Sequence, residues 1–216
     1  MPTEIKTIRL PLPLRFGYVN CYLLESGGNR LLIDTACANS RRRLERELAG
    51  SPPGLIILTH GDFDHSGNAA RLRRKFGAKI AMHRGDASMV EKGDIFGGRS
   101  RGRFLFRLIA PAIFGFWRSA RFSPDLYLED GDSLSDYGFD ARIVHMPGHS
   151  RGSIGVLTTE GELFGGDLVI RGNGAKRNKL IDDPAAAEAS IKKLKSLGVK
   201  TVYPGHGRPF EMGELG

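Results

Sequence analysis

The sequence predicts an α/β fold with four layers, an αββα sandwich in which two mixed β-sheets pack face to face with helices outside. Two observations lead to this prediction. Strand-like runs are followed by a helical segment, and this order occurs twice along the chain. No Pro/Ser-rich linker and no internal repeat divides the 216 residues, of which 40% are hydrophobic. We therefore expect one domain over residues 1–216.

The first half of the chain reads as strands, a helix, a strand, a helix and a strand. A Gly-Gly turn joins the second and third of the N-terminal strands: Ile5–Leu10, Tyr18–Glu25 and Asn29–Asp34. A helix over Ser40–Leu48 follows, with Asn39 or Ser40 as its cap. Next come a strand, a helix that ends at Gly77 and a further strand: Leu55–Thr59, Gly67–Phe76 and Lys79–His83.

The second half is richer in strands and ends in one helix and one strand. The predicted strands are Leu126–Leu128, Phe139–His145, Ile154–Thr158, Glu162–Phe164 and Thr201–Tyr203. The helix spans Pro184–Leu197, because proline suits the first helical position after the Asp182-Asp183 cap.

A helical insertion is expected between the two halves, at about Gly93–Phe122. Its apolar residues fall on one helical stripe, and Pro111 splits or kinks the helix. The segment is too short and too charged to span a bilayer. Four interpretations stay open: a lid over a site, a dimer contact, a basic surface for membranes, or an insertion packed on its own core.

The chain carries a net charge of +8, much of it from arginine. This balance favours anionic partners, whether nucleic acid, acidic lipid or a carboxylate substrate, but solvated helix faces are the preferred explanation. No nucleic-acid motif accompanies the charge. Two cysteines make a disulfide framework improbable, and the amino terminus has no secretory pattern, so a cytoplasmic location is expected.

Side chains that can bind metal gather where predicted strands end. His60-Gly61-Asp62-Phe63-Asp64-His65 directly follows an apolar run, and three later members each follow a strand-like run and a glycine: His149, Asp167 and His206. Strand ends are where α/β proteins place their sites, and glycine lets the chain turn sharply there. Imidazoles and carboxylates without a thiolate suit borderline and hard divalent metals. The pattern therefore predicts a metal site.

These motifs resemble those of the metallo-β-lactamase superfamily. The family signature is Thr-His-x-His-x-Asp-His followed by distant His, Asp and His, and here Asp62 replaces the second histidine. The resemblance implies two divalent ions, zinc with manganese or iron possible. It also implies seven ligands: His60, Asp62 and His149 for one ion, Asp64, His65 and His206 for the other, and Asp167 as their bridge.

The resemblance further implies a hydrolase similar to glyoxalase II. The expected substrate is a small anionic ester, thioester or lactone, attacked by a hydroxide between the metals that Asp64 orients. A phosphodiesterase or nuclease, a di-iron redox protein and a non-catalytic binding module remain alternatives. Flavodiiron proteins resemble this chain in carrying a carboxylate at the second motif position. A small-molecule substrate is the expected partner; nucleic acid is not favoured, and a homodimer is possible.

Several neighbouring residues are expected to support the site. Asp34 ends a strand and suits an acceptor that fixes a ligand imidazole. Pro147-Gly148 rules out a helix between His145 and His149, so His145 and also His83 are interpreted as structural. The remaining residues are assigned structural roles without direct chemistry: Ser66 and Ser150 in turns or caps, Cys21 in the core, Cys37 as an unreactive loop thiol, and Gly205 and Gly207 in a tight turn around His206.

Overall fold

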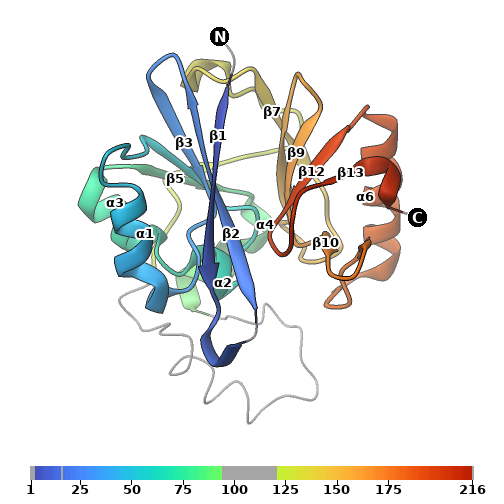
Figure 1. The fold of residues 1–216 in the computed structure, drawn as a ribbon, viewed down its shortest axis with the longest axis horizontal. Coiled ribbons are helices and arrows are strands. Elements are labelled where there is room, and N and C mark those ends of the chain that lie inside the picture. The colour runs from blue at the N-terminus through green and yellow to red at the C-terminus, as the bar shows by residue number, and fades with distance from the viewer. Residues whose placement is uncertain (1–2, 16, 94–120, 216) are drawn as a thin grey trace.

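The computed structural model describes residues 3–15, 17–93 and 121–215 (Figure 1). Most of the predicted helical insertion, residues 94–120, lies outside the described residues. Within the described part of the chain, no helix has the length and apolar character needed to cross a bilayer.

The first sheet contains six strands in the order β1-β2-β3-β4-β5-β6. The strands from β1 to β3 pair antiparallel, and those from β3 to β6 pair parallel. Their bounds are β1 Glu4–Pro11, β2 Tyr18–Ser26, β3 Asn29–Ile33, β4 Leu55–Ile57, β5 Lys79–Met82 and β6 Leu126–Tyr127. The predicted strands of this half are all present.

The second sheet contains five strands in the order β13-β12-β9-β8-β7, with β12 and β9 parallel and the other neighbours antiparallel. Its strands are β7 Ala141–His145, β8 Ile154–Thr158, β9 Glu162–Gly166, β12 Thr201–Pro204 and β13 Phe210–Glu211. A separate hairpin, β10 Val169–Arg171 and β11 Ala175–Arg177, follows β9 and was not predicted. Both sheets are mixed, as expected.

Helices α1 and α3 lie outside the first sheet and α6 lies outside the second (Figure 1). The α-helices of the described residues are α1 Arg41–Glu47, α2 Phe63–Ser66, α3 Ala69–Phe76, α4 Arg84–Lys92 and α6 Pro184–Ser196. Short 3-10 turns are η1 Pro13–Arg15, η2 Ala38–Ser40, η4 Ser135–Tyr137 and η5 Met212–Glu214. Helix α4 was not predicted, because the stretch that forms it is short and polar.

The helix ends agree with the predicted ones at two positions and differ at two others. Gly77 ends α3 with a φ of 72°, and Asp183 accepts hydrogen bonds from the first amides of α6. Ser40 precedes α1 but does not cap it, because its hydroxyl donates to the carbonyl of Pro11 instead. The start of the helix predicted at Gly67 also moves, since α3 begins at Ala69.

Three hydrophobic layers explain why the central strands are apolar at every position. On β4, Ile56 packs outward with Leu44 and Leu72 of the helices, whereas Ile57 packs inward with the second sheet. On the far side, the second sheet packs against α6. A strand covered on both faces must bury alternate side chains in both directions, and each buried aliphatic side chain contributes about 1.5–3 kcal/mol. This is the four-layer sandwich that the sequence predicts.

The ends of the two sheets are tied together where the metal-capable residues lie. The amide of Asn20 on β2 donates to the carbonyl of Gly205, and the Tyr22 hydroxyl donates to Pro204 at 2.7 Å. The amide of Ile154 on β8 donates to the carbonyl of Thr59, which follows β4. These bonds join loops that lie far apart in the sequence, so the sandwich fixes their relative positions.

Candidate metal centre

The seven predicted ligand residues lie together at this edge of the sandwich. Asp62 Oδ2 lies 3.2 Å from His149 Nε2 and 3.4 Å from His60 Nε2. Asp64 Oδ2 lies 3.3 Å from His206 Nε2. The ligand atoms form three groups, within each of which all atoms lie within 4.8 Å of one another: His60, Asp62 and His149; Asp64, His65 and His206; and His60, His65 and Asp167.

Asp167 lies between the two outer groups. Its Oδ1 is 3.4 Å from His65 Nε2, and its Oδ2 is 3.2 Å from His206 Nε2. It also belongs to the group that contains His60. A carboxylate with its two oxygens turned toward different imidazoles has the geometry needed to bridge two cations.

Each of the four clustered imidazoles is oriented through its Nδ1 atom. The Nδ1 contacts are His60 with Thr59 Oγ1 at 2.9 Å, His65 with Asp34 Oδ2 at 2.7 Å, His149 with the Leu180 carbonyl at 2.6 Å and His206 with the Tyr18 carbonyl at 2.7 Å. Carbonyl and carboxylate oxygens only accept hydrogen bonds, and the Thr59 hydroxyl accepts from His60 because it donates its own proton to Asp34, so Nδ1 carries a proton in all four rings. In the neutral form of each ring, Nε2 is therefore the nitrogen with the lone pair, and it faces the common centre.

The centre contains buried polar atoms without a hydrogen-bond partner among the described residues: His60 Nε2, His65 Nε2 and Asp167 Oδ1. Leaving a buried acceptor unsatisfied costs about 1–3 kcal/mol, and natural structures rarely tolerate several in one place. Nitrogen lone pairs and carboxylate oxygens that converge in this way fit divalent metal ions, which would satisfy all of them at once.

Burial and the closeness of imidazoles to carboxylates shift the pKa values of the residues in the centre. Burial lowers the pKa of His60, and the neighbouring His65 lowers it further, which keeps this imidazole neutral. Burial alone would raise the pKa of Asp167, but the imidazoles of His206 and His65 hold it well below its usual value. For His206, burial is outweighed by the charge of Asp167, so its pKa is raised. Cations entering the centre must displace protons from such imidazoles.

Glycines allow the loops to approach one another. A Cβ atom on Gly205 would collide with Asp167 Oδ1 and would lie 2.6 Å from His65 Cε1. Gly166 has a φ of +53°, and a Cβ there would lie 2.6 Å from Thr59 Oγ1. Gly207, on the other side of His206, has a φ of +101°. The tight turn predicted around His206 is therefore a close approach to the buried carboxylate.

The two remaining histidines lie outside the cluster. The rings of His83 and His145 stack with centroids 4.1 Å apart and an interplanar angle of 12°. His83 Nδ1 accepts from the amide of Gly85 at the start of α4, and His145 Nε2 lies 3.0 Å from the Arg151 carbonyl. Both have structural contacts, in line with their interpretation from the sequence. Both cysteines are buried free thiols, and burial raises their pKa.

Two residues at this edge of the sandwich were missed by the sequence reasoning. Thr59 places its hydroxyl between Asp34 and His60. Asp86, at the start of α4, is 1% exposed and bonds to loops on both sides of the centre. The threonine belongs to the motif and could have been considered, whereas no local pattern marks Asp86.

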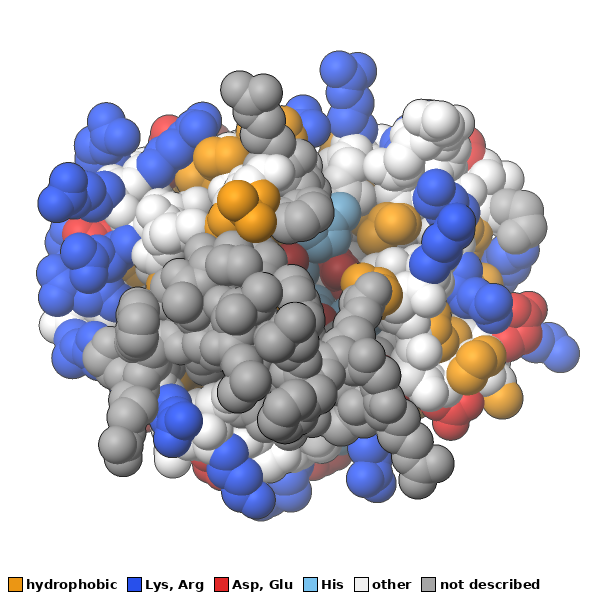
Figure 2. Space-filling view, turned by 90° about the horizontal axis from the view of Figure 1, so that it is seen from below, with side chains coloured by type: hydrophobic (Ala, Val, Ile, Leu, Met, Phe, Trp, Pro, Cys, Tyr) orange, Lys and Arg blue, Asp and Glu red, His pale blue; other side chains and the backbone are white. Residues whose placement is uncertain are grey.

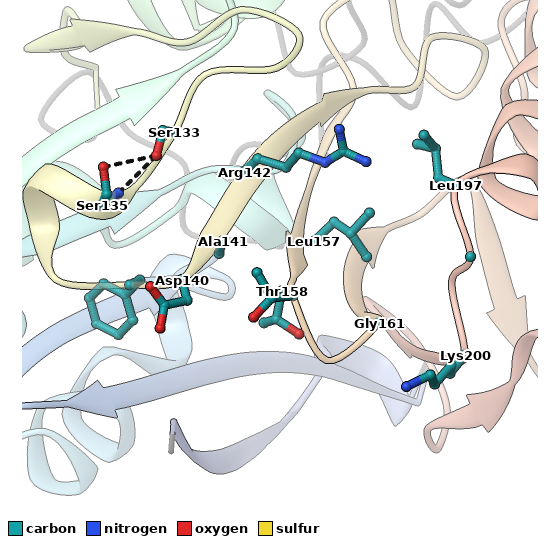
Figure 3. A pocket seen from close by; sticks show the side chains of 13 residues that line it. Ser133, Ser135, Asp140, Ala141, Arg142, Leu157, Thr158, Gly161, Leu197 and Lys200 are labelled. Carbon is teal, nitrogen blue, oxygen red and sulfur yellow. Dashed lines mark hydrogen bonds between the residues drawn. The ribbon is translucent and has the colours of Figure 1, made fainter. Parts of the chain in front are cut away.

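A cavity of about 470 Å³ lies away from the clustered histidines (Figure 3). It is formed near the start of β7, the end of β8 and the connection from α6 to β12, and Arg142, Leu157 and Lys200 are among its lining residues. None of the clustered imidazoles or carboxylates lines it. The clustered imidazoles and carboxylates therefore lie at the opposite end of the second sheet from this cavity.

The fold and the histidine–aspartate centre agree with the comparison with known families. The family model described as the metallo-beta-lactamase superfamily matches residues 14–206, and the chain belongs to this superfamily.

Among its relatives, the chain is 31% identical to the acyl-coenzyme A thioesterase MBLAC2 of Homo sapiens over 78% of its own length, but it spans only 61% of that protein. It is 28% identical to the hydroxyacylglutathione hydrolase GloC of Haemophilus influenzae, covering 94% of this chain and 92% of GloC. The superfamily and these relatives support a metal-dependent hydrolase.

Solved structures support the same fold. TTHA1623 in a di-iron-bound form has 31% sequence identity and a TM-score of 0.71, covering 94% of this chain and 95% of that one. The B3 metallo-beta-lactamase BLEG-1 has 26% identity and a TM-score of 0.71, covering 98% and 95%. The fold is thus shared over nearly the whole length of both structures.

Proposed function

We propose that the protein is a binuclear metal-dependent hydrolase of acyl thioesters. The observation that carries this proposal is the set of four imidazoles whose Nδ1 atoms are all held by acceptors, so that every Nε2 faces one centre with three carboxylates. When bound, two divalent ions would supply the Lewis acidity that polarises an acyl carbonyl and lowers the pKa of water.

The chain's own carboxylates divide the work in this proposal. Asp167, with its oxygens near His65 and His206, would hold the two ions together. Asp64 is more exposed than Asp167, with 14% against 8% of the side chain accessible. We assign Asp64 the additional role of orienting the attacking water, because it combines access to solvent with contact to His206.

The preference for a thioester rests on the relatives and on the surface around the centre. The carbonyls that hold His206 and His149 belong to Tyr18 and Leu180, and both side chains are exposed, at 47% and 58%. Figure 2 shows imidazole and carboxylate atoms within a hollow, with hydrophobic side chains beside it. Apolar side chains at the mouth suit an acyl group, since substrate sites are mostly apolar with few polar groups.

An anionic carrier for the acyl group fits the charge of the chain. The net charge is +8, and lysine and arginine side chains surround this face (Figure 2). The hairpin that follows Asp167 contributes the exposed residues Lys176 and Arg177. A basic surface raises the local concentration of an anionic substrate and its rate of encounter.

Iron and manganese are candidates beside zinc. Asp62 supplies a carboxylate where the family commonly has an imidazole, and oxygen ligands suit harder cations. The di-iron-bound form of TTHA1623 is a structural neighbour with 31% identity. A di-iron redox function therefore stays as the second candidate, and absorbance of the purified protein together with its iron content would distinguish it.

The test joins metal analysis to a substrate panel. The native protein is analysed for metal content and then assayed with thioester, ester, lactone and phosphodiester substrates. We expect two ions per chain and the highest kcat/KM for an anionic acyl thioester. Asp167→Ala should lower turnover at least ~100-fold, the scale found when support of a metal site is lost. A stoichiometry near zero at saturating zinc, manganese and iron would overturn the proposal, as would activity confined to phosphodiesters.

A further inference from the structure

Asp86 is a buried carboxylate that no part of the proposed chemistry uses. It lies in the first turn of α4 and is 1% exposed. Its Oδ2 accepts hydrogen bonds from the amide of Gly61 at 3.0 Å and from the Ser150 hydroxyl at 2.6 Å, and its Oδ1 accepts from the amide of Gly152 at 2.7 Å. One carboxylate thus binds three donors from two separate loops.

These two loops together carry all three residues of one metal-capable group. Gly61 lies between His60 and Asp62 in the loop after β4. Ser150 directly follows His149, in the loop between β7 and β8. Asp86 therefore connects the two loops that carry the group of His60, Asp62 and His149. Its hydrogen bonds go to Gly61, Ser150 and Gly152, none of which belongs to the group of Asp64, His65 and His206.

The backbone packing around Asp86 leaves little freedom for either loop. A Cβ atom on Gly152 would lie 2.5 Å from the amide nitrogen of Asp86 and 2.8 Å from its Oδ1. A Cβ atom on Gly61 would lie 2.8 Å from the Cβ of Met89, one turn further along α4. Glycine at both positions allows the two loops to contact the same helix, with the carboxylate between them.

A carboxylate matches this hydrogen-bonding environment and an amide does not. A carboxylate only accepts, so both of its oxygens can receive donors from both sides. Asparagine has one accepting oxygen and one donating nitrogen. In Asp86→Asn the nitrogen would face either Gly152 or the pair of Gly61 and Ser150, so one loop would lose its anchor while the volume of the side chain stays the same.

We propose that Asp86 is a positioning residue that sets the distance between His149 and the His60–Asp62 pair and thereby the metal affinity of that position alone. The inference rests on the two-metal centre of the proposed function. Asp86 contacts neither ion nor substrate; it acts through the two loops. Replacing Asp86 should therefore weaken metal binding at one of the two positions and not at the other. A general loss of stability would weaken both.

The experiment compares the wild type, Asp86→Asn and a control, Asp125→Asn. Asp125 also uses a carboxylate oxygen to accept a backbone amide, that of Ile80 at 2.8 Å, but near the start of β5 rather than at the centre. Metal-free proteins are titrated with zinc against a chelator to obtain both binding steps. Hydrogen exchange of residues 59–62 and 146–153 is measured in the metal-free state, together with thermal unfolding.

We expect two zinc ions in the wild type and in Asp125→Asn. In Asp86→Asn one binding step should weaken about 10–100-fold while the other is retained, and exchange should rise in both loops. Unchanged affinities in Asp86→Asn, or equal weakening of both steps, would overturn this inference while leaving the proposed function intact. A wild type that binds no zinc, manganese or iron would overturn both.

Discussion

Asp34 Oδ2 accepts a hydrogen bond from His65 Nδ1 at 2.7 Å and a second from the Thr59 hydroxyl at 2.8 Å. The Thr59 oxygen in turn lies 2.9 Å from His60 Nδ1. One buried carboxylate thus fixes two imidazoles, directly and through a hydroxyl, and their ring centroids are only 4.1 Å apart. Asp34 achieves this from a left-handed backbone conformation with a φ of 62°.

Asp34→Asn should weaken binding of both ions about 10–100-fold, the range seen when the partner of a metal-binding histidine is changed. Asparagine tolerates the left-handed backbone, so the fold should persist. Its amide nitrogen, placed toward His65 Nδ1, would favour the tautomer that protonates the metal-facing Nε2. Chelator competition measures the effect. Thr59→Val serves as the matched control, because it removes the hydroxyl that links Asp34 to His60 and leaves the Asp34–His65 hydrogen bond in place. Metal affinities in Asp34→Asn equal to those of the wild type would contradict the argument that Asp34 orients the imidazoles.

Gly205→Ala should remove metal binding more strongly than its small change in volume suggests. The added methyl would collide with Asp167 Oδ1 and lie against His65, and overpacking of this kind costs about 1–3 kcal/mol. Metal stoichiometry and the midpoint of thermal unfolding report the two effects. Gly213→Ala is the control, since a Cβ there meets no atom within 4 Å. If Gly205→Ala and Gly213→Ala have the same metal stoichiometry and the same midpoint of thermal unfolding, the turn at Gly205 accommodates a methyl group and the prediction is wrong.

Asp62→His should shift metal preference toward zinc. The carboxylate of Asp62 lies 3.2 Å from His149 Nε2 and favours manganese or iron more than an imidazole does. Loss of its negative charge also leaves the positive field of the ions less compensated, so the pH at which activity rises should fall. Activity of both proteins is compared after reconstitution with zinc and with manganese. If both proteins rank the metals identically and have identical pH profiles, Asp62 is not a metal ligand.

Stability should decline in mildly acidic solution partly because of His83. Burial, followed by the neighbouring His145, lowers the pKa of His83 in the folded protein. The unfolded chain therefore binds the proton first as pH falls through the ordinary histidine range near ~6.5, and folding is progressively disfavoured toward the lower folded pKa. In His83→Asn, which keeps an acceptor for the Gly85 amide, the midpoint of thermal unfolding should fall less between pH 7.5 and 5.5. An unchanged pH slope would contradict the assignment.

The sequence determined the composition of the centre and its place in the fold. Strand-like runs predicted both sheets, because apolar side chains at successive positions are needed where both faces are covered, as at Ile56 and Ile57. The ligand-type residues could be found because imidazole and carboxylate side chains stand at strand ends beside glycine. Asp34 was identifiable for the same reason: it is a carboxylate directly after β3.

Only the tertiary structure decided how these residues are oriented and supported. The rings of His149 and His206 are held by the backbone carbonyls of Leu180 and Tyr18, and every residue type has such a carbonyl, so the sequence contains no signal for these contacts. Asp86 meets Gly61 and Gly152 across separations of 25 and 66 residues, through a short helix that was not predicted. Such contacts arise from the packing of the two sheets against each other, which brings together chain segments whose local patterns are independent.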